Sequence, residues 1–430
     1  MNEKKILMII NFFPPAGGGG VYRPLAFVKY LSRLSWRVTV VTPQPGEFWI
    51  SDPGLEAQVP REVRVVRTAS LSGLRLLRAL RPGGRGAASR RSSRGFGALR
   101  RLGEHVLVPD TYRGWVPFAS RAAEDLCRAE HFDAVYSTSP PDSSHLVALP
   151  IARRFGIPWV ADFRDPWINL HLRKPPTPLH RMTHERLEAS VARRALLLVT
   201  TIAQEEMFRR DYPGCRVERI PNGYDEEDFA GLDDRPPATG LFAVSHVGML
   251  TLGRSSRPFL EGLALLKRRS PAKAAAARVA FIGARESANE EWVRSLGLEE
   301  IVVFEDNLPH REVVRRECRS HVLLLIKHDD ERYRGLVPGK LFEYIGARRP
   351  ILGVVPEGEA ARIIRDLRRG EIASIGEPAG IAEAFERMFD RYVSGELDRA
   401  YSLEEMPGYS RRVEAERLGA ILERLIEEGR

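Results

Sequence analysis

The sequence predicts an α/β protein made of two doubly wound domains, each a parallel sheet wrapped by helices. Three observations support this fold class. Short apolar runs, typical of buried parallel strands, alternate with segments of helical periodicity. The alternation stops at a loop of Asp, Pro and Gly at 233–240 and then restarts. A chain of 430 residues with 43% hydrophobic residues is also too long for one ordinary core.

These observations divide the chain into four parts. Residues 1–232 are predicted to form the first domain, and residues 233–240 a linker. Residues 241–395 are predicted to form the second domain, and residues 396–430 a set of closing helices.

The first domain is expected to begin with a β-α-β unit. Lys5–Ile10 and Arg37–Thr42 have the composition of buried strands, and Val21–Leu34 has the pattern of a helix between them. The alternation continues through three strands and two helices: Ala134–Tyr136, Trp159–Asp162 and Leu196–Thr201, with Ser144–Arg154 and His184–Arg194.

The second domain repeats this architecture without repeating the sequence. Its predicted strands are Phe242–Val247, Arg278–Ile282, Ile301–Phe304, Val322–Ile326 and Pro350–Val354. A ligand shared by two such domains is expected in a cleft that both domains face, at the carboxyl ends of their strands.

A final helix is predicted at Ser410–Glu428, because apolar residues recur there with helical spacing. We expect it to pack back across the first domain.

The composition indicates a cytoplasmic protein. Cys127, Cys215 and Cys318 lie far apart and form neither an evident disulfide framework nor a metal-binding pattern. The apolar start, Met1–Phe13, lacks the cleavage pattern of a signal peptide and is better explained as a buried strand. No run approaches 18 apolar residues, so no membrane-spanning helix is expected.

The formal charge of +9 comes from one segment, residues 63–103, which contains eleven arginines and no acidic residue. Without those eleven, 55 basic residues face 57 acidic ones. Leucines interleave with the arginines, which favours contact of Arg75–Arg101 with an anionic membrane surface. A solvated loop is the alternative, because glycines and serines interrupt the segment. Nucleic acid is the least favoured partner, because only Phe96 is available for stacking.

The run Gly335–Tyr344 is the strongest candidate for a binding site. The predicted strand before it ends near a polar loop, and a helix is expected from Lys340 onward. Lys340 and Glu343 lie on one helix face, so a phosphate could meet the ammonium while a ribose diol donates to the carboxylate. The alternative is an exposed ion pair between residues i and i+3.

Two familiar nucleotide motifs do not fit this chain. Only three residues separate Gly335 from Gly339, and Leu341 occupies the place of the magnesium-binding Ser or Thr of a phosphate-binding loop. Glycines 17–20 follow the first strand too late for a dinucleotide site, and the second strand ends in Thr42-Pro43 without the acid that binds ribose.

The glycines still permit close approach of a phosphate or sugar at the start of the next helix. The candidate residues for this contact are Gly18, Gly19 and Arg23.

Taken together, the motifs resemble those of glycosyltransferases of the GT-B fold, specifically the retaining family 4, and the resemblance covers nearly the whole chain. The blocks that carry it are Pro14–Arg23, Tyr136–His145, Pro158–Trp167, Ile220–Asp225, His246–Leu250 with Gly253-Arg254, Phe281–Gly283 and Pro338–Tyr344.

This resemblance implies two Rossmann-like domains and transfer of a sugar from a nucleotide-diphosphate donor to a hydroxyl acceptor. The donor is expected mainly on the second domain, with Gly248, Arg254, Lys340 and Glu343 as its binding residues. The chain departs from the usual pair of motif glutamates, because Gly335 stands where the first is expected.

The first domain is expected to hold the acceptor and catalytic groups. His145 lies near a helix start, and Asp162, Arg164 and Asp165 follow a strand end. The resemblance makes His145, Asp162 and Asp165 catalytic candidates and Arg164 an acceptor or phosphate contact. The alternatives are helix capping, packing of His145, and an ion pair between Arg164 and Asp165.

The predicted function is therefore a retaining, metal-independent hexosyltransferase without a cofactor. It is expected to use a nucleotide sugar as donor and a glycan or lipid-linked molecule as acceptor. The predicted role is polysaccharide or glycolipid assembly, by a protein bound peripherally to the cytoplasmic face of the membrane. No metal ligand set and no nucleic-acid partner are predicted. A sugar-nucleotide epimerase of the same shape and a non-catalytic membrane-surface protein are the alternatives.

Overall fold

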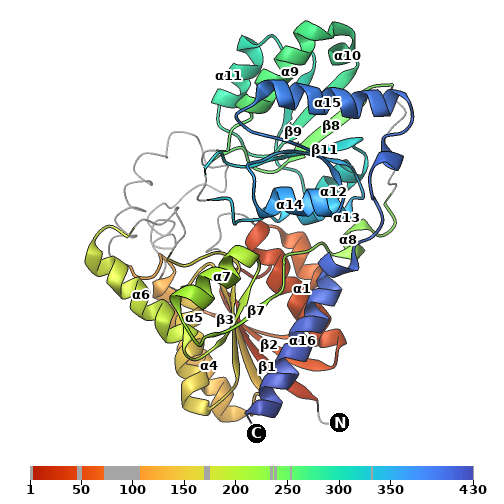
Figure 1. Cartoon of the computed structure of the whole chain (residues 1–430). Coiled ribbons are helices and arrows are strands. Elements are labelled where there is room, and N and C mark those ends of the chain that lie inside the picture. The colour runs from red at the N-terminus through yellow and green to blue at the C-terminus, as the bar shows by residue number, and fades with distance from the viewer. Residues whose placement is uncertain are drawn as a thin grey trace, which may run out of the picture. The chain divides into compact units, whose positions relative to one another are not determined.

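The computed structural model describes residues 3–45, 51–71, 107–168, 175–232, 236, 240–251, 254–330 and 333–429 (Figure 1). The chain forms two compact units. Unit 1 comprises Met1–Pro221 and Arg412–Arg430, and unit 2 comprises Asn222–Arg411. The division thus follows Pro221, whereas the sequence places the first domain boundary at 232. Most of the predicted linker, 233–235 and 237–239, lies outside the described residues.

Unit 1 contains a seven-stranded parallel sheet with the order β3-β2-β1-β4-β5-β6-β7. Its order reverses between β1 and β4, where Ile6 is paired with Ala134 and Ile9 with Ser137. The strands are β1 (Lys4–Ile9), β2 (Trp36–Pro43), β3 (Arg64–Thr68), β4 (Ala134–Ser139), β5 (Trp159–Phe163), β6 (Leu196–Val199) and β7 (Arg216–Arg219).

Helices cover both faces of this sheet, and its central strands β1 and β4 are buried on both sides over most of their length. One core lies between the sheet and the helices α1 (Gly19–Arg33) and α16 (Arg411–Glu428), which lie side by side (Figure 1). The other core contains α4 (Val116–Ala129), α5 (Ser143–Phe155), α6 (Pro178–Ala192) and α7 (Ile202–Asp211). The predicted packing of the final helix on the first domain is confirmed.

Unit 2 contains a six-stranded parallel sheet with the order β10-β9-β8-β11-β12-β13, which reverses between β8 and β11. Ligands of doubly wound sheets bind at such reversals, outside the carboxyl ends of the strands. The strands are β8 (Phe242–Val247), β9 (Ala277–Ile282), β10 (Val302–Glu305), β11 (Val322–Ile326), β12 (Ile351–Val354) and β13 (Gly370–Ala373).

Two further cores flank the sheet of unit 2. One contains α9 (Arg257–Arg269), α10 (Pro271–Ala275), α11 (Ala288–Ser295) and α15 (Pro378–Val393). The other contains α8 (Glu226–Phe229), α12 (His310–Cys318), α13 (Lys340–Gly346) and α14 (Glu359–Asp366). Short 3₁₀ helices occur at Pro53–Gln58, Arg113–Trp115, Asp398–Ala400 and Pro407–Tyr409. The predicted fold class, two parallel α/β sheets of the doubly wound type, is confirmed.

Candidate functional site

In unit 2, the end of β8 places His246 and Gly248 beside Lys340 of α13. His246 is fully buried, and its Nδ1 lies 2.8 Å from the carbonyl oxygen of Leu324. Donation by Nδ1–H to that carbonyl leaves Nε2 as an acceptor, which lies 3.2 Å from Lys340 Nζ. Burial, and then the nearby ammonium, lower the pKa of His246 well below its usual value. A neutral imidazole thus accepts a hydrogen bond from the lysine.

Gly248 is required by the position of that lysine. Its φ is +118°, a region that favours glycine, and a Cβ there would lie 2.5 Å from Lys340 Nζ. The absence of a side chain lets the amine lie against the backbone after β8. Gly248 and Lys340, both predicted as donor contacts, are therefore brought together by the structure.

Lys340 carries an ammonium in an unfavourable environment. Burial is the main cause that lowers its pKa to about 7, and the positive charge of Arg254 adds to the effect. Glu343 and Glu317 oppose the shift. Among the described residues, no carboxylate lies within ion-pair distance of Lys340, so the alternative of an exposed ion pair with Glu343 is wrong.

Arg254 supplies the second cation of the site. Its side chain is half-buried, and within the described ranges its guanidinium has neither a hydrogen-bond nor an ion-pair partner. Burial lowers its pKa, as expected for a charge removed from water without a counter-ion. Two neighbouring cations with no carboxylate at ion-pair distance among the described residues favour binding of an anion.

Glu343 lies one helical turn after Lys340 and is half-buried. No hydrogen-bond partner of its carboxylate is present in the described part of the chain, so its oxygens are free to accept. The helix α13 has only seven residues, so its dipole is small, and the positive charge comes from the side chains.

Sequence reasoning missed two buried groups around this site. Glu317 of α12 is fully buried, and neither carboxyl oxygen has a hydrogen-bond partner among the described residues. Burial, and then the charge of Glu343, raise the pKa of Glu317 well above its usual value. The residues next to Glu317 in sequence are mostly charged, which is typical of an exposed helix. No local sequence signal therefore indicates that Glu317 is buried.

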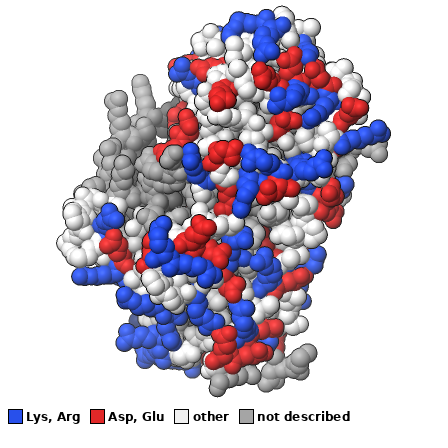
Figure 2. All heavy atoms as spheres, in the orientation of Figure 1, with Lys and Arg blue, Asp and Glu red and all other residues white. Residues whose placement is uncertain are grey.

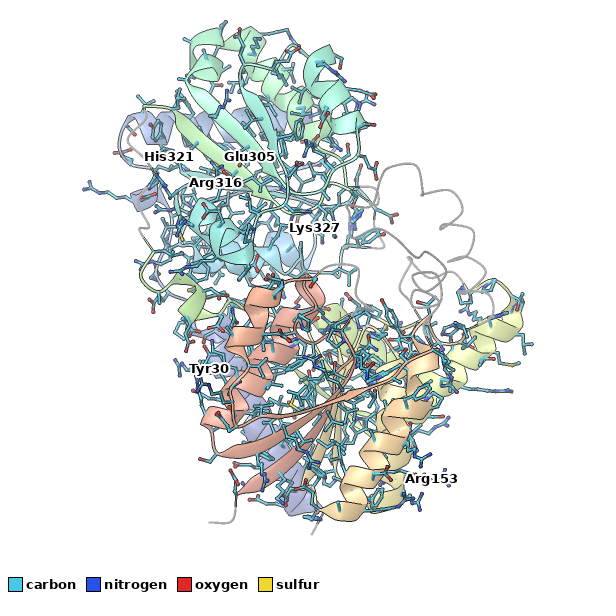
Figure 3. The ribbon with its side chains drawn as sticks, turned by 180° about the vertical axis from the view of Figure 1, so that it is seen from behind. Tyr30, Arg153, Glu305, Arg316, His321 and Lys327 are labelled. Carbon is cyan, nitrogen blue, oxygen red and sulfur yellow. The ribbon has the colours of Figure 1, made fainter. Side chains whose placement is uncertain are left out.

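Lys327 is the other missed residue, directly after β11 (Figure 3). It is 5% exposed, and burial lowers its pKa to about 8. A lysine at the end of an apolar strand is a weak sequence signal, because such positions usually reach solvent. Asp329 and Asp330 follow Lys327 and are candidates for contact with a donor sugar, which stays a prediction; Glu331, a third candidate, lies outside the described residues.

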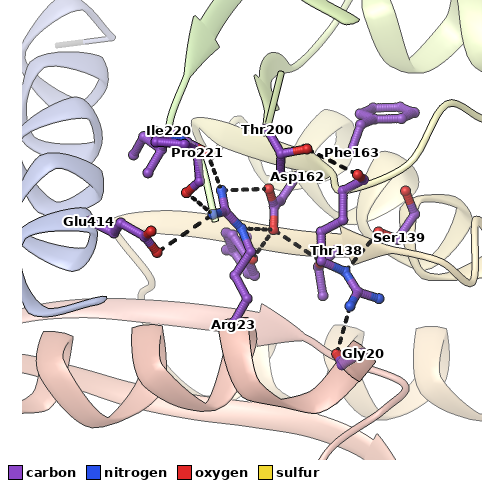
Figure 4. A network of polar contacts seen from close by, with 12 residues as sticks. Gly20, Arg23, Thr138, Ser139, Asp162, Phe163, Thr200, Ile220, Pro221 and Glu414 are labelled. Carbon is purple, nitrogen blue, oxygen red and sulfur yellow. Dashed lines mark hydrogen bonds and ion pairs between the residues drawn. The ribbon is translucent and has the colours of Figure 1, made fainter. Parts of the chain in front are cut away.

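In unit 1, Arg23 and Asp162 form a buried ion pair (Figure 4). Arg23 Nε lies 3.1 Å from Asp162 Oδ2, and Nη2 lies 3.2 Å from Oδ1. The other N–H groups of Arg23 donate to the carbonyls of Ile220 and Pro221 or face Glu414 at 3.7 Å. Arg23 is 1% exposed, so it has no donor left for the phosphate contact predicted from the sequence.

The carboxylate of Asp162 is equally occupied. Besides Arg23, it accepts hydrogen bonds from the hydroxyls of Tyr136 at 2.6 Å and Thr138 at 3.1 Å. Asp162 is fully buried. The geometry therefore gives Asp162 a role in the scaffold in place of the predicted catalytic role, because a saturated, buried carboxylate is not presented to a substrate.

Arg164 joins the glycine loop, residues 17–20, to the segment that follows β4. Its side chain donates to the carbonyls of Ser139 at 3.0 Å, Pro140 at 2.7 Å and Gly20 at 2.8 Å. Asp165 is half-buried, and its charge is the leading electrostatic influence on Arg164. The alternative of an Arg164–Asp165 interaction thus has support, and a substrate role for either residue stays a prediction.

His145 is fully buried in the first turn of α5. Its Nδ1 lies 2.8 Å from Ser137 Oγ, and burial is the main cause that lowers its pKa to about 3. Its Nε2 has no hydrogen-bond partner in the described part of the chain. Asn11 and Ser139, at the carboxyl ends of β1 and β4, also have buried polar atoms without partners. These groups lie where unit 1's sheet order reverses and are suited to bind polar ligand atoms or water.

The glycine loop itself is only partly explained. Gly18 precedes α1 with a φ of 92°, which favours glycine. A side chain at Gly19 would meet no described atom within 4 Å. The space beside Gly19 is compatible with the predicted close approach of a ligand, which stays a prediction.

The Arg-rich segment begins as part of the sheet of unit 1. Arg64 and Arg67 belong to β3, where they pair with Glu130 at 3.0 Å and Glu56 at 3.3 Å. The predicted membrane segment therefore does not extend over residues 63–68. Arg75–Arg101 lies outside the described residues. Elsewhere, Lys and Arg are intermingled with Asp and Glu on the face shown in Figure 2.

Two searches of the described residues gave negative results. None of their helices has the length and apolar character needed to cross a membrane. Among the same residues, no group of three or more His, Cys, Asp and Glu side chains is arranged to hold a metal ion.

Comparison with known proteins gives a family match for part of the chain and a shared fold for nearly all of it. Residues 17–223 match the family described as "Glycosyl transferase 4-like domain". No curated protein matches the chain. Sucrose-phosphate synthase from Thermosynechococcus elongatus is 14% identical, with a TM-score of 0.64 over 99% of this chain and 100% of that one. Trehalose 6-phosphate synthase from Burkholderia multivorans is 12% identical, with a TM-score of 0.65 over 99% and 97%.

A third similar structure carries ligands. Anabaena HepE, in complex with UDP and glucose, is 14% identical, with a TM-score of 0.61 over 98% of this chain and 100% of that one. At such identities the similarity shows a shared fold.

Proposed function

We propose that this chain transfers a sugar from a nucleotide-diphosphate sugar to a hydroxyl acceptor. The proposal is supported by the match of residues 17–223 to the glycosyl transferase 4-like domain and by the GT-B fold. The observation that carries this proposal is the pair of cations in unit 2. Lys340 and Arg254 lie at the reversal of the sheet order, near enough to influence each other, and have no carboxylate partner among the described residues. A diphosphate is an anion that satisfies both.

Glu343 completes the proposed donor site. Its free carboxylate oxygens suit the hydroxyls of a ribose, one helical turn from the lysine that meets the phosphate. A uridine nucleotide is the first donor to test, because the similar HepE structure contains UDP.

The chemistry assigned to these residues is electrostatic. As the bond between the anomeric carbon and the diphosphate breaks, negative charge grows on the leaving group. Lys340 and Arg254 stabilise that charge without a metal ion. We further propose that the anomeric configuration is retained and that the transferred sugar is a hexose, as the resemblance to family 4 implies.

Titration calorimetry tests the donor site directly. We expect UDP, and less so GDP and ADP, to bind the protein in EDTA. Lys340→Met and Glu343→Gln should each weaken binding about 10- to 100-fold, as expected for charged or hydrogen-bonded contacts. Lys267→Met is the matched control, since Lys267 is a half-buried lysine of unit 2 that donates to Gly297 O at 2.6 Å. If none of the three nucleotides binds, the proposal is contradicted.

Turnover assays separate transfer from epimerisation. An epimerase needs no acceptor, so UDP release that depends on an added acceptor supports a transferase. NMR of the product's anomeric proton decides retention. Loss of turnover in EDTA, recovered on adding a divalent cation, would overturn the metal-independent mechanism.

The proposed site of action is the cytoplasmic face of an anionic membrane, in polysaccharide or glycolipid assembly. The support is the composition of Arg75–Arg101, in which leucines interleave with arginines. Deletion of residues 75–101 should abolish sedimentation with phosphatidylserine vesicles while UDP binding persists. Unchanged sedimentation would show that the segment is only a loop.

A further inference from the structure

Lys327 is a buried lysine that holds a loop together through main-chain carbonyls. Its Nζ lies 2.8 Å from the carbonyl oxygen of Tyr333, 2.6 Å from that of Leu336 and 3.5 Å from that of Arg334. Three carbonyls within four residues thus point at one ammonium. An ammonium has three N–H donors, so this set matches its full capacity.

Because Lys327 is buried, its ammonium depends on these hydrogen bonds. It is 5% exposed, and no carboxylate lies within ion-pair distance of it in the described part of the chain. A buried charge is expensive unless hydrogen bonds compensate it. The loop carbonyls are the hydrogen-bond partners of this ammonium among the described residues, and the charge of Glu359 adds a longer-range stabilisation. Moving the loop away would therefore leave a buried ammonium without a hydrogen bond.

Other contacts hold the same loop from outside. The ring of Tyr333 stacks on His328, with centroids 4.0 Å apart and an interplanar angle of 12°. The backbone of Gly358, before α14, lies so close that a Cβ there would be 2.7 Å from the carbonyl oxygen of Arg334. The loop is therefore enclosed between the end of β11 and the start of α14.

This loop leads directly into the candidate donor site. Only residues 337–339 separate Leu336 from Lys340, whose Nζ rests against His246 and Gly248. Tyr333 also lies near enough to Arg254 to affect its pKa. The two cations of the site are thus at, or next to, the segment that Lys327 holds.

We propose that Lys327 is a positioning residue of the donor site, acting through the loop 333–339 to set the place of Lys340. Lys327 contacts carbonyls of the protein and no substrate, so it is not a catalytic residue. The inference rests on the proposed function only in naming the ligand, a nucleoside diphosphate. The hydrogen bonds between Lys327 and the loop carbonyls do not depend on which ligand the site binds.

Hydrogen exchange of the ligand-free protein tests that hold. In Lys327→Met, which keeps the length of the side chain without its charge, we expect faster exchange of the amides at 334–345 and unchanged exchange in β8 and β11. Lys267→Met is the control, because its ammonium donates to a single carbonyl elsewhere in unit 2. Unchanged exchange at 334–345 in Lys327→Met would overturn the inference.

Kinetics and binding provide the second readout. Because small displacements of binding groups cost up to about 100-fold, we expect Lys327→Met to raise the UDP dissociation constant and the KM for the sugar nucleotide about 10- to 100-fold. The KM for the acceptor should stay within about twofold of the wild-type value, since we expect Lys327 to affect only donor binding. Equal UDP affinity in wild type and Lys327→Met would contradict the proposal.

A second variant covers the case in which Lys327→Met fails to fold. Gly358→Ala displaces the carbonyl of Arg334 while Lys327 stays in place. It should loosen the same amides and weaken UDP binding in the same direction. If the wild type binds none of UDP, GDP and ADP, the proposed function fails, but hydrogen exchange in the two variants still decides whether Lys327 positions the loop.

Discussion

Lys340 shows how surroundings change the chemistry of a single residue. Burial and the charge of Arg254 lower the pKa of its ammonium to about 7, while Glu343 and Glu317 act in the opposite direction. A bound diphosphate adds negative charge beside the amine and therefore raises this pKa. Ligand binding and protonation of Lys340 must then favour each other.

We therefore predict that UDP binding takes up about 0.5–1 proton at pH 8 and fewer at pH 6, and that affinity falls as pH rises above 7. Calorimetry in two buffers of different ionisation enthalpy measures the uptake. Lys340→Met should abolish it, whereas Lys267→Met should leave it unchanged. Binding to the wild type without proton uptake at pH 8 would show that the diphosphate does not meet this ammonium.

Asp162 illustrates the opposite case, in which a residue that looks catalytic is part of the scaffold. Asp162→Asn leaves the buried guanidinium of Arg23 with Glu414 at 3.7 Å as its remaining counter-charge. We predict a loss of about 3–5 kcal/mol in the free energy of unfolding of unit 1, measured with urea. The control Asp125→Asn removes an exposed pair with Arg128 and should cost no more than about 1 kcal/mol. A stable but inactive Asp162→Asn would restore the catalytic assignment.

At the scale of elements, strands with a high apolar content could be predicted from the sequence, and strands with a low apolar content could not. Val322–Ile326 and Phe242–Val247 are predicted to the residue, because buried parallel strands are apolar on both faces. The strands β3, β7 and β13 were missed. Each lies at a sheet edge and is partly exposed, so its residues resemble those of a loop.

The carboxyl end of β4 was missed for a different reason. The strand continues beyond Tyr136 to Ser139 through polar residues that are buried. Thr138 donates to the carboxylate of Asp162, a residue of the neighbouring strand. Polarity suggested a loop, but a partner distant in sequence satisfies the hydroxyl.

The helix α6 contains a buried acid whose effect on stability depends on pH. Glu188 is 2% exposed, and burial raises its pKa to about 8, although Tyr212 donates to its Oε2 at 2.7 Å. The folded state therefore holds this proton more tightly than the unfolded chain does. The stabilisation is fully present below the unfolded pKa of about 4.3 and is lost as pH rises towards 8.

We predict that Glu188→Gln has little effect at pH 5 but stabilises unit 1 by about 1–3 kcal/mol at pH 8.5, because the amide mimics the neutral acid. Urea unfolding at both pH values measures the difference. Glu185→Gln, an exposed acid of the same helix paired with Arg181, is the control and should change stability by less than about 1 kcal/mol at either pH. A Glu188→Gln variant less stable than the wild type at pH 8.5 would contradict the assignment.

At the scale of the whole molecule, unit 1 is built from both ends of the chain. The core that covers one face of its sheet includes Leu418 and Leu422 of α16, both fully buried. A fragment that ends at Pro221 lacks this helix and exposes the apolar residues that it covers. The chain must therefore return from unit 2 before unit 1 is complete.

We predict that Leu418→Ala and Leu422→Ala each destabilise unit 1 by about 2–5 kcal/mol, as expected for cavities in a packed core. Urea unfolding of the full chain measures this. Arg424→Ala, which breaks an exposed pair with Glu218, should cost less than about 1 kcal/mol. If residues 1–221 alone fold with the stability of unit 1, the helix is dispensable and the prediction is wrong.

The sequence by itself determined the fold class, the packing of the last helix and the helix that begins at Lys340, because apolar periodicity and local spacing are properties of the chain itself. Only the tertiary structure decided the roles of individual polar residues. Arg23 and Asp162 became a buried ion pair, and His246 and Lys327 joined the surroundings of Lys340. The physical reason is that the free energy of a charge depends on burial and on partners far away in sequence, which neither composition nor spacing records.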